Sequence, residues 1–138
     1  MTVRVLIADS SPAARDILRQ HLECGGCRIV AETETARHTI DLFRTTRPQV
    51  VTLDAGLKIS DGRDALSVFR TIRRESPETS IVIVNVSRPI VETEFFVNEG
   101  ALDCVLNSFN SYALESMWRR LSGIYPELRR SDGMASGR

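Results

Sequence analysis

Short apolar runs alternate along the chain with longer segments in which apolar residues recur every three or four positions. The short runs are typical of buried parallel strands, and the longer segments of helices that cover a sheet. Strands are expected at residues 3–8, 28–32, 50–53, 81–86 and 104–106. Helices are expected from Pro12 to the turn at 24–27 and over residues 36–45, 63–75, 91–98 and 111–122. This alternation predicts an α/β domain with one parallel sheet.

Two of the expected strands end in an aspartate. Val3 to Asp9 is an apolar run that stops at a carboxylate, and Pro48 to Asp54 repeats the design. Functional groups of open α/β sheets collect beyond the carboxyl ends of such strands. Asp9 and Asp54 are therefore expected in one crevice, where they would begin a site for a metal ion and an anion.

Length and composition narrow the class of protein. The chain has 138 residues, which predicts a single domain over 1–122, and the Pro-, Arg-, Ser- and Gly-rich residues 123–138 suggest a flexible tail or linker stub. Lys plus Arg and Asp plus Glu balance at 18 each, with no block of like charge, so direct nucleic-acid binding is not expected. The absence of a membrane-length apolar stretch and of a signal peptide, with three cysteines, predicts a cytoplasmic protein.

Four motifs together resemble the receiver domain of bacterial response regulators. They are Val5–Pro12, which joins the first strand to an acidic turn, Pro48–Asp54, the pair Asp61-Gly62 and the pair Gly100-Ala101. The resemblance covers about residues 2–122. It implies a flavodoxin-like (βα)5 fold, a doubly wound parallel sheet with strand order 2-1-3-4-5.

The resemblance also implies a phosphorylation chemistry. Asp54 stands at the phospho-acceptor position, and Mg²⁺ would be held by Asp9, Asp54 and the backbone carbonyl of Gly56. A receiver uses this metal ion, a Ser or Thr after the fourth strand and a Lys after the fifth to stabilise the phosphoryl group. An aromatic residue on the fifth strand then relays the state.

This chain departs from that pattern at several positions. Ser10 replaces the second acid, Asn85 the Ser or Thr, Cys104 the aromatic residue and Asn107 the Lys, while Lys58 replaces a loop proline. A neutral hydroxyl in place of an anionic ligand predicts weak Mg²⁺ binding. A neutral amide in place of a cation predicts slow phosphoryl transfer, since charge-assisted contacts are roughly twice as strong as neutral ones.

The main hypothesis is therefore a receiver-like domain that works by protein–protein interaction, with a degenerate phosphorylation site. It would not be an enzyme, beyond phosphorylating itself from a small phosphodonor at Asp54. One alternative is a functional response regulator whose Asp54 accepts phosphate from a histidine kinase, helped by the amide of Asn85 and by a Lys58 ammonium that folds in to pair with Asp54. Another alternative is that Asp54 only caps a loop or the third helix.

A further hypothesis concerns the run Cys24-Gly25-Gly26-Cys27, which is a candidate thiol-based sensor. His21 extends it to His-x-x-Cys-x-x-Cys, but no second such pair completes a zinc site. The alternative is a tight turn in which the cysteines are small apolar residues.

Receivers usually bind partners through the face formed by the fourth helix, the fifth strand and the fifth helix. Here the residues expected on that face are Phe95, Phe96, Cys104, Trp118, Arg119 and Arg120. One of the two phenylalanines is expected in the core. Trp118 is either an exposed hot spot beside the arginines or an edge of the core. The expected partners are a histidine kinase or another signalling protein, or a second copy bound through this face.

Overall fold

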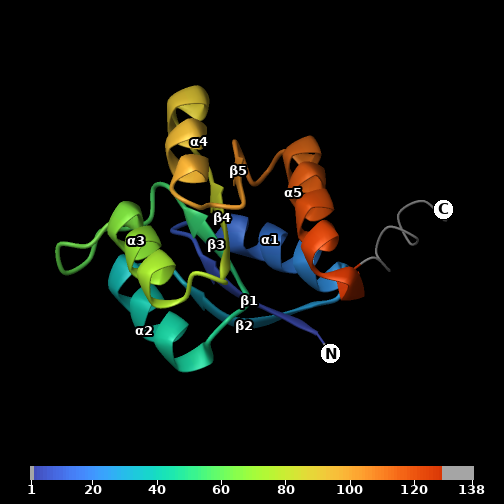
Figure 1. The fold of residues 1–138 in the computed structure, drawn as a ribbon, viewed down its shortest axis with the longest axis horizontal. Coiled ribbons are helices and arrows are strands. Elements are labelled where there is room, and N and C mark those ends of the chain that lie inside the picture. Colours follow the sequence, from blue (N-terminus) through green and yellow to red (C-terminus); the bar gives the residue numbers. More distant parts are fainter. Residues whose placement is uncertain (1, 129–138) are drawn as a thin grey trace.

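The central element of the fold is one sheet of five parallel strands in the order β2-β1-β3-β4-β5 (Figure 1). The computed structural model describes residues 2–128. The strands are β1 Val3–Ala8, β2 Cys27–Thr33, β3 Val50–Asp54, β4 Ser80–Val84 and β5 Asp103–Val105. The flavodoxin-like topology and the strand order predicted from the sequence are confirmed.

Helices cover both faces of this sheet (Figure 1). They are α1 Pro12–Cys24, α2 Ala36–Thr46, α3 Ala65–Glu75, α4 Pro89–Asn98 and α5 Ser111–Ile124, followed by the 3₁₀ helix η1 Pro126–Leu128. The apolar sides of α1 and α5 pack with one face of the sheet, and those of α2, α3 and α4 with the other. The three central strands β1, β3 and β4 are therefore buried on both faces, which explains their largely apolar sequences, whereas the edge strands β2 and β5 are only partly buried.

Local hydrogen bonds decide where several elements begin and end. Helix α3 starts at Ala65 rather than at residue 63, because the side chains of Asp64 and Ser67 exchange hydrogen bonds with each other's backbone amides in a capping box. Strand β4 stops at Val84, earlier than expected, because Asn85 has a φ of 60° and leaves the extended conformation.

The described chain stays packed beyond the boundary expected at residue 122. Helix α5 continues to Ile124, and the hydroxyl of Tyr125 donates to the carbonyl of Gln49 at 3.1 Å and lies 2.9 Å from the hydroxyl of Ser80. Leu128 is fully buried. A tail beginning at residue 123 is therefore wrong for 123–128, and the remainder of the expected tail lies outside the described residues.

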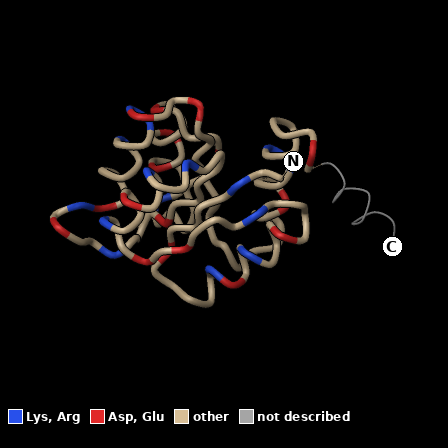
Figure 2. Tube along the Cα trace, turned by 90° about the horizontal axis from the view of Figure 1, so that it is seen from below, with Lys and Arg blue, Asp and Glu red and all other residues tan. Residues whose placement is uncertain are grey.

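The surface carries both signs of charge along its length. Figure 2 shows Lys and Arg segments interspersed with Asp and Glu segments. Within residues 2–128, none of the helices combines the length and the apolar character that crossing a bilayer requires.

Candidate functional site

The two aspartates predicted to share a crevice do lie together at the carboxyl end of the sheet. Strands β1 and β3 are direct neighbours, with Ala8 paired to Leu53, so the next residue on each strand is an aspartate. Asp9 is 1% exposed and Asp54 is 5% exposed. The parallel register thus buries two carboxylates side by side.

The Asp54 carboxylate accepts three hydrogen bonds, all from neutral donors. The backbone amide of Ser10 donates to Oδ2 at 3.1 Å, and that of Gly56 donates to Oδ1 at 2.8 Å. The side-chain amide of Asn85 donates to Oδ1 at 3.4 Å. The loops after β1, β3 and β4 therefore converge on this one side chain.

The Asp9 carboxylate also accepts hydrogen bonds from neutral donors, and burial raises its pKa. The backbone amide of Ser11 donates to Oδ1 at 2.9 Å, and Nδ2 of Asn85 donates to Oδ2 at 3.2 Å. The pKa of the Asp9 carboxyl is raised to about 6, mainly by burial; the hydrogen bond from the Ser11 amide lowers it, and the neighbouring charge of Asp54 raises it further. Part of the charge in this crevice is therefore removed by protonation at mildly acidic pH.

Asn85 joins the two carboxylates through one side chain. Its Nδ2 donates to both Asp9 and Asp54, while its Oδ1 accepts from the backbone amide of Ser108 at 3.1 Å and from the Ser108 hydroxyl at 3.2 Å. Ser108 is fully buried in the loop between β5 and α5. Only one orientation of the amide satisfies two acceptors at one end and two donors at the other.

The residues present do not fit the Mg²⁺ site that the sequence suggested. The carbonyl oxygen of Gly56, a candidate ligand, accepts a hydrogen bond from the Ser10 hydroxyl at 3.2 Å. The amide of Asn85 donates to one oxygen of each carboxylate, Asp9 Oδ2 and Asp54 Oδ1. Mg²⁺ binds one or two carboxylates and completes its octahedral shell with water, but here an amide donor already lies against one oxygen of each carboxylate.

No lysine reaches the crevice in the described part of the chain. The ammonium of Lys58, the only lysine of the sequence, lies 3.6 Å from the Glu34 carboxylate, so the hypothesis that Lys58 pairs with Asp54 is wrong. The backbone explains this, because the Lys58 carbonyl accepts from the amide of Ala36 and ties the loop to the start of α2. Asn107, at the expected lysine position, is exposed, and its Oδ1 accepts from the Phe109 amide at 2.8 Å.

The expected interaction face is only partly exposed. Phe96 is buried, as expected for one of the two phenylalanines, whereas Phe95 is 38% exposed, with the Arg70 guanidinium 5.8 Å from its ring centroid. Cys104 is half-buried. Arg119 is exposed, and Arg120 lies 3.5 Å from the Asp103 carboxylate.

An exposed hot spot at Trp118 is wrong, because this side chain is only 5% exposed. It packs against the end of α1, with its ring edge-on to His21 at 6.2 Å. A Cβ placed on Gly25 would come within 2.0 Å of the indole. Gly25, the first glycine of the Cys-Gly-Gly-Cys turn, therefore leaves the space that the indole of Trp118 fills.

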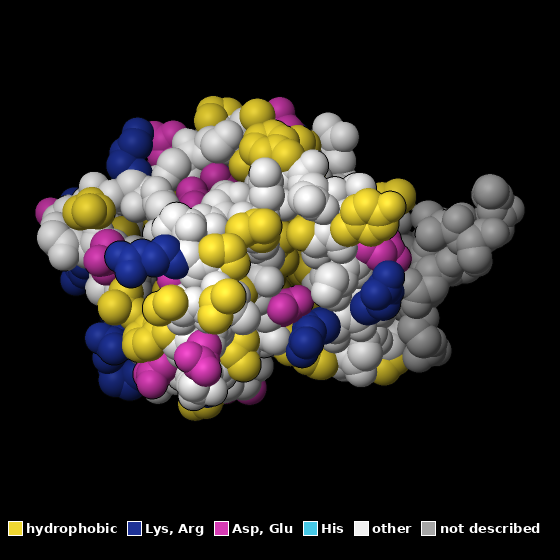
Figure 3. Space-filling view, turned by 90° about the horizontal axis from the view of Figure 1, so that it is seen from above, with side chains coloured by type: hydrophobic (Ala, Val, Ile, Leu, Met, Phe, Trp, Pro, Cys, Tyr) yellow, Lys and Arg dark blue, Asp and Glu magenta, His cyan; other side chains and the backbone are white. Residues whose placement is uncertain are grey.

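Besides Phe95, which the sequence placed on this face, several apolar residues that the sequence analysis did not name reach the surface here. Helix α4 and the start of α5 both flank the edge strand β5, and Figure 3, which looks from the side of α4, shows hydrophobic side chains at the surface in several places. The exposed ones on these elements and on the loop between β5 and α5 are Ile90, Val91, Phe95, Val97, Leu106, Phe109 and Tyr112. The available signal was the sequence of α4, whose apolar residues are not confined to one stripe.

The thiols of the Cys-Gly-Gly-Cys turn differ in exposure. Cys24 is exposed and Cys27 is buried, and both are free. Burial raises the pKa of the Cys27 thiol to about 12. Reactive cysteines have lowered pKa values because the thiolate is the nucleophile, so this environment favours a structural turn.

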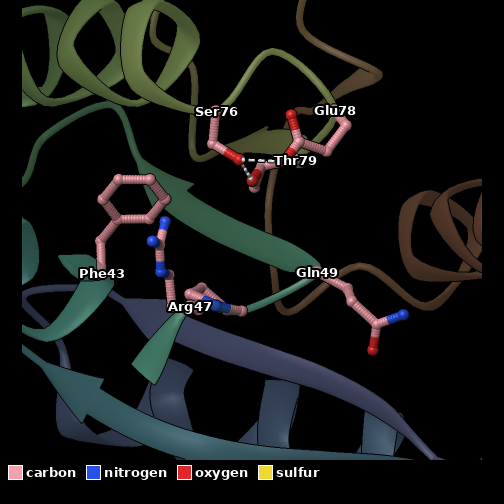
Figure 4. A pocket seen from close by; sticks show the side chains of 7 residues that line it. Phe43, Arg47, Gln49, Ser76, Glu78 and Thr79 are labelled. Carbon is pink, nitrogen blue, oxygen red and sulfur yellow. Dashed lines mark hydrogen bonds between the residues drawn. The ribbon is translucent and has the colours of Figure 1, made fainter. Parts of the chain in front are cut away.

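A small hollow of about 100 Å³ lies at the opposite end of the sheet (Figure 4). Its lining includes the residues that precede β3 and β4, far from the carboxyl ends of these strands. Three of its polar side chains are linked to one another, since the Thr79 hydroxyl donates to Ser76 at 2.7 Å and the Ser76 hydroxyl donates to Glu78 at 2.9 Å.

Known proteins resemble this chain over most of its length. The family described as response regulator receiver domain matches residues 5–119. Response regulator MprA of Mycolicibacterium vanbaalenii is 28% identical over 133 residues, which is 96% of this chain and 54% of that protein. Protein-glutamate methylesterase/protein-glutamine glutaminase 3 of Hahella chejuensis is 37% identical over 83 residues, 60% of this chain and 23% of that protein. The chain thus spans about half or less of these two relatives.

Solved structures share the fold. The CheX-CheY-BeF3-Mg complex from Borrelia burgdorferi matches with a TM-score of 0.76 at 14% identity, covering 89% of each chain. The response regulator domain of Thermotoga maritima CheB matches with a TM-score of 0.74 at 18% identity, covering 88% of this chain and 96% of that one.

Proposed function

Because the chain belongs to the response regulator receiver domain family, we propose that it is a receiver whose phosphorylation site is degenerate and which signals by binding other proteins. The observation that carries this proposal is the environment of Asp54. Its carboxylate accepts from three neutral donors, the amides of Ser10, Gly56 and Asn85. Among the described residues, the ion pairs of the Lys and Arg side chains are all with other carboxylates.

The electrostatics of phosphoryl transfer explain why this matters. Negative charge spreads over the transferred group, and catalysis consists mainly of positioning and of stabilising that charge with metal ions and cationic side chains. Here the loop cation Lys58 is paired with Glu34. The side chain of Asn107 is neutral, and its Oδ1 accepts a hydrogen bond from the backbone amide of Phe109. Transfer to Asp54 is therefore expected to be slow or absent, although the acceptor itself is retained.

The binding surface of this proposal is the region around α4, β5 and the start of α5. Exposed aromatic side chains such as Phe109 and Tyr112 are typical of interface hot spots, and apolar patches on a small domain mark interaction sites. A histidine kinase, another signalling protein or a second copy of this chain would bind there. The cytoplasmic location expected from the sequence remains a prediction.

A direct test is the intact mass of the protein after incubation with acetyl phosphate and Mg²⁺. The proposal predicts no gain of a phosphoryl group. A gain that disappears in the Asp54→Asn variant would instead establish a working phospho-acceptor and overturn the proposal. Circular dichroism of both proteins checks that the variant is folded.

A further inference from the structure

We propose that the side-chain amide of Asn85, aimed by Ser108, takes the place of a divalent cation between Asp9 and Asp54. This chain would then hold its own neutral substitute for a metal ion. The inference rests on the proposed function, because it explains how the acceptor site is silenced, and it adds the identity of the group that fills the site.

The contacts of Asn85 carry the first step of the argument. Its two N–H bonds are directed at Asp9 Oδ2 and Asp54 Oδ1, at 3.2 and 3.4 Å. Two buried carboxylates repel each other and lose solvation, so a positively polarised group between them stabilises the pair. A bridging cation would serve the same purpose, and it would compete with the amide for the same oxygens.

Ser108 fixes which end of the amide faces the carboxylates. It donates twice to Oδ1, once from its backbone amide and once from its hydroxyl. A rotated amide would bring Nδ2 against two donors and Oδ1 against two anions, and this arrangement is strongly unfavourable. The buried serine is therefore a positioning residue for Asn85.

The backbone of Asn85 supports the same role. Its φ of 60° lies in the left-handed region, which asparagine tolerates better than the β-branched threonine does. This conformation turns the chain out of β4 directly beside the end of β3, which bears Asp54, and the side chain also reaches Asp9. The amide then connects the loop after β4, the loop after β5 and both acidic strand ends in one network that needs no bound ion.

The test is thermal unfolding with and without Mg²⁺, using the isosteric variant Asn85→Asp. The wild type is expected to show no Mg²⁺-dependent change in Tm. The variant replaces the bridging donor by a third carboxylate, so its Tm is expected to fall without metal and to rise by roughly 3–6 °C when Mg²⁺ is added well above its Kd. Asn98→Asp, which makes the same charge change at an exposed position on α4, is the control and is expected to show no Mg²⁺ response.

A second variant keeps the proposal testable if Asn85→Asp does not fold without metal. Asn85→Gly retains the left-handed backbone and removes the amide, so it is expected to gain a Mg²⁺ binding signal in isothermal titration calorimetry that the wild type lacks. Mg²⁺ binding by the wild type, or no Mg²⁺ response in either Asn85 variant, would overturn the inference. Phosphorylation of a wild type that binds no Mg²⁺ would overturn the proposed function alone.

Discussion

The titration of the Asp9 carboxyl should make the stability of the fold depend on pH. The pKa of this group is about 6 in the folded protein, against an ordinary value of 3.8. Between these values the folded state binds more protons than the unfolded state, so the contribution of Asp9 to stability is greatest below pH 4 and is lost as pH rises through 6. The difference of about two pKa units corresponds to about 3 kcal/mol, since each unit is worth about 1.4 kcal/mol.

The Asp9→Asn variant isolates this contribution, because it has no proton to lose and keeps an oxygen for the Ser11 amide. The assay is urea unfolding of both proteins at several values between pH 4 and pH 7. The wild type is expected to lose about 2.4 kcal/mol relative to the variant across this range, because a small part of the full effect lies below pH 4. Any fixed cost of the substitution cancels in that comparison.

Asp41→Asn, which removes an exposed carboxylate from α2, is the matched control. It is expected to follow the wild type at each pH. A stability difference between wild type and Asp9→Asn that stays constant from pH 4 to pH 7 would refute the reasoning, because it would mean that Asp9 titrates equally in both states.

Two further predictions concern the turn between α1 and β2. Gly25→Ala is expected to destabilise the protein by about 1–3 kcal/mol through its clash with Trp118. Gly123→Ala is the control, because a Cβ at this position in helix α5 meets nothing within 4 Å, and it is expected to stabilise the protein by about 0.5–1 kcal/mol. Equal effects of the two substitutions in urea unfolding would contradict the packing argument. In the native protein, iodoacetamide is expected to label Cys24 and to spare Cys27, whose thiol is buried with a pKa of about 12; peptide mass mapping that finds rapid labelling of Cys27 would revive a thiol-based role.

Those parts of the fold and of the site that follow from a repeating pattern of apolar residues could be predicted from the sequence. Unbroken apolar runs followed by aspartates placed β1 and β3 correctly and brought Asp9 and Asp54 to one edge of the sheet. This works because parallel register is set by many buried residues at once. That an aspartate ends the second of these runs, and that Asn107 rather than a lysine follows the last one, is likewise evident from the sequence alone.

Residues whose roles depend on a single tertiary contact were beyond prediction. Lys58 lies toward Glu34 because of a backbone hydrogen bond to α2, and no sequence pattern encodes that bond. Trp118 is followed in the sequence by two arginines, as in many interface hot spots. In the fold its side chain is buried instead, because Gly25, which is distant along the chain, has no side chain to fill the same space. The pairing of Asn85 with Ser108 joins two loops whose relative position follows only from the folded sheet.

The central claim, that neutral substitutions have silenced a retained acceptor, is tested most directly by a time course of intact mass with acetyl phosphate and Mg²⁺. The wild type is compared with a Ser10→Asp, Asn107→Lys double variant, which restores an anionic metal ligand and a cation to the crevice. We expect the wild type to remain unmodified and the double variant to gain one phosphoryl group. Modification of the wild type at the rate of the double variant would contradict the account.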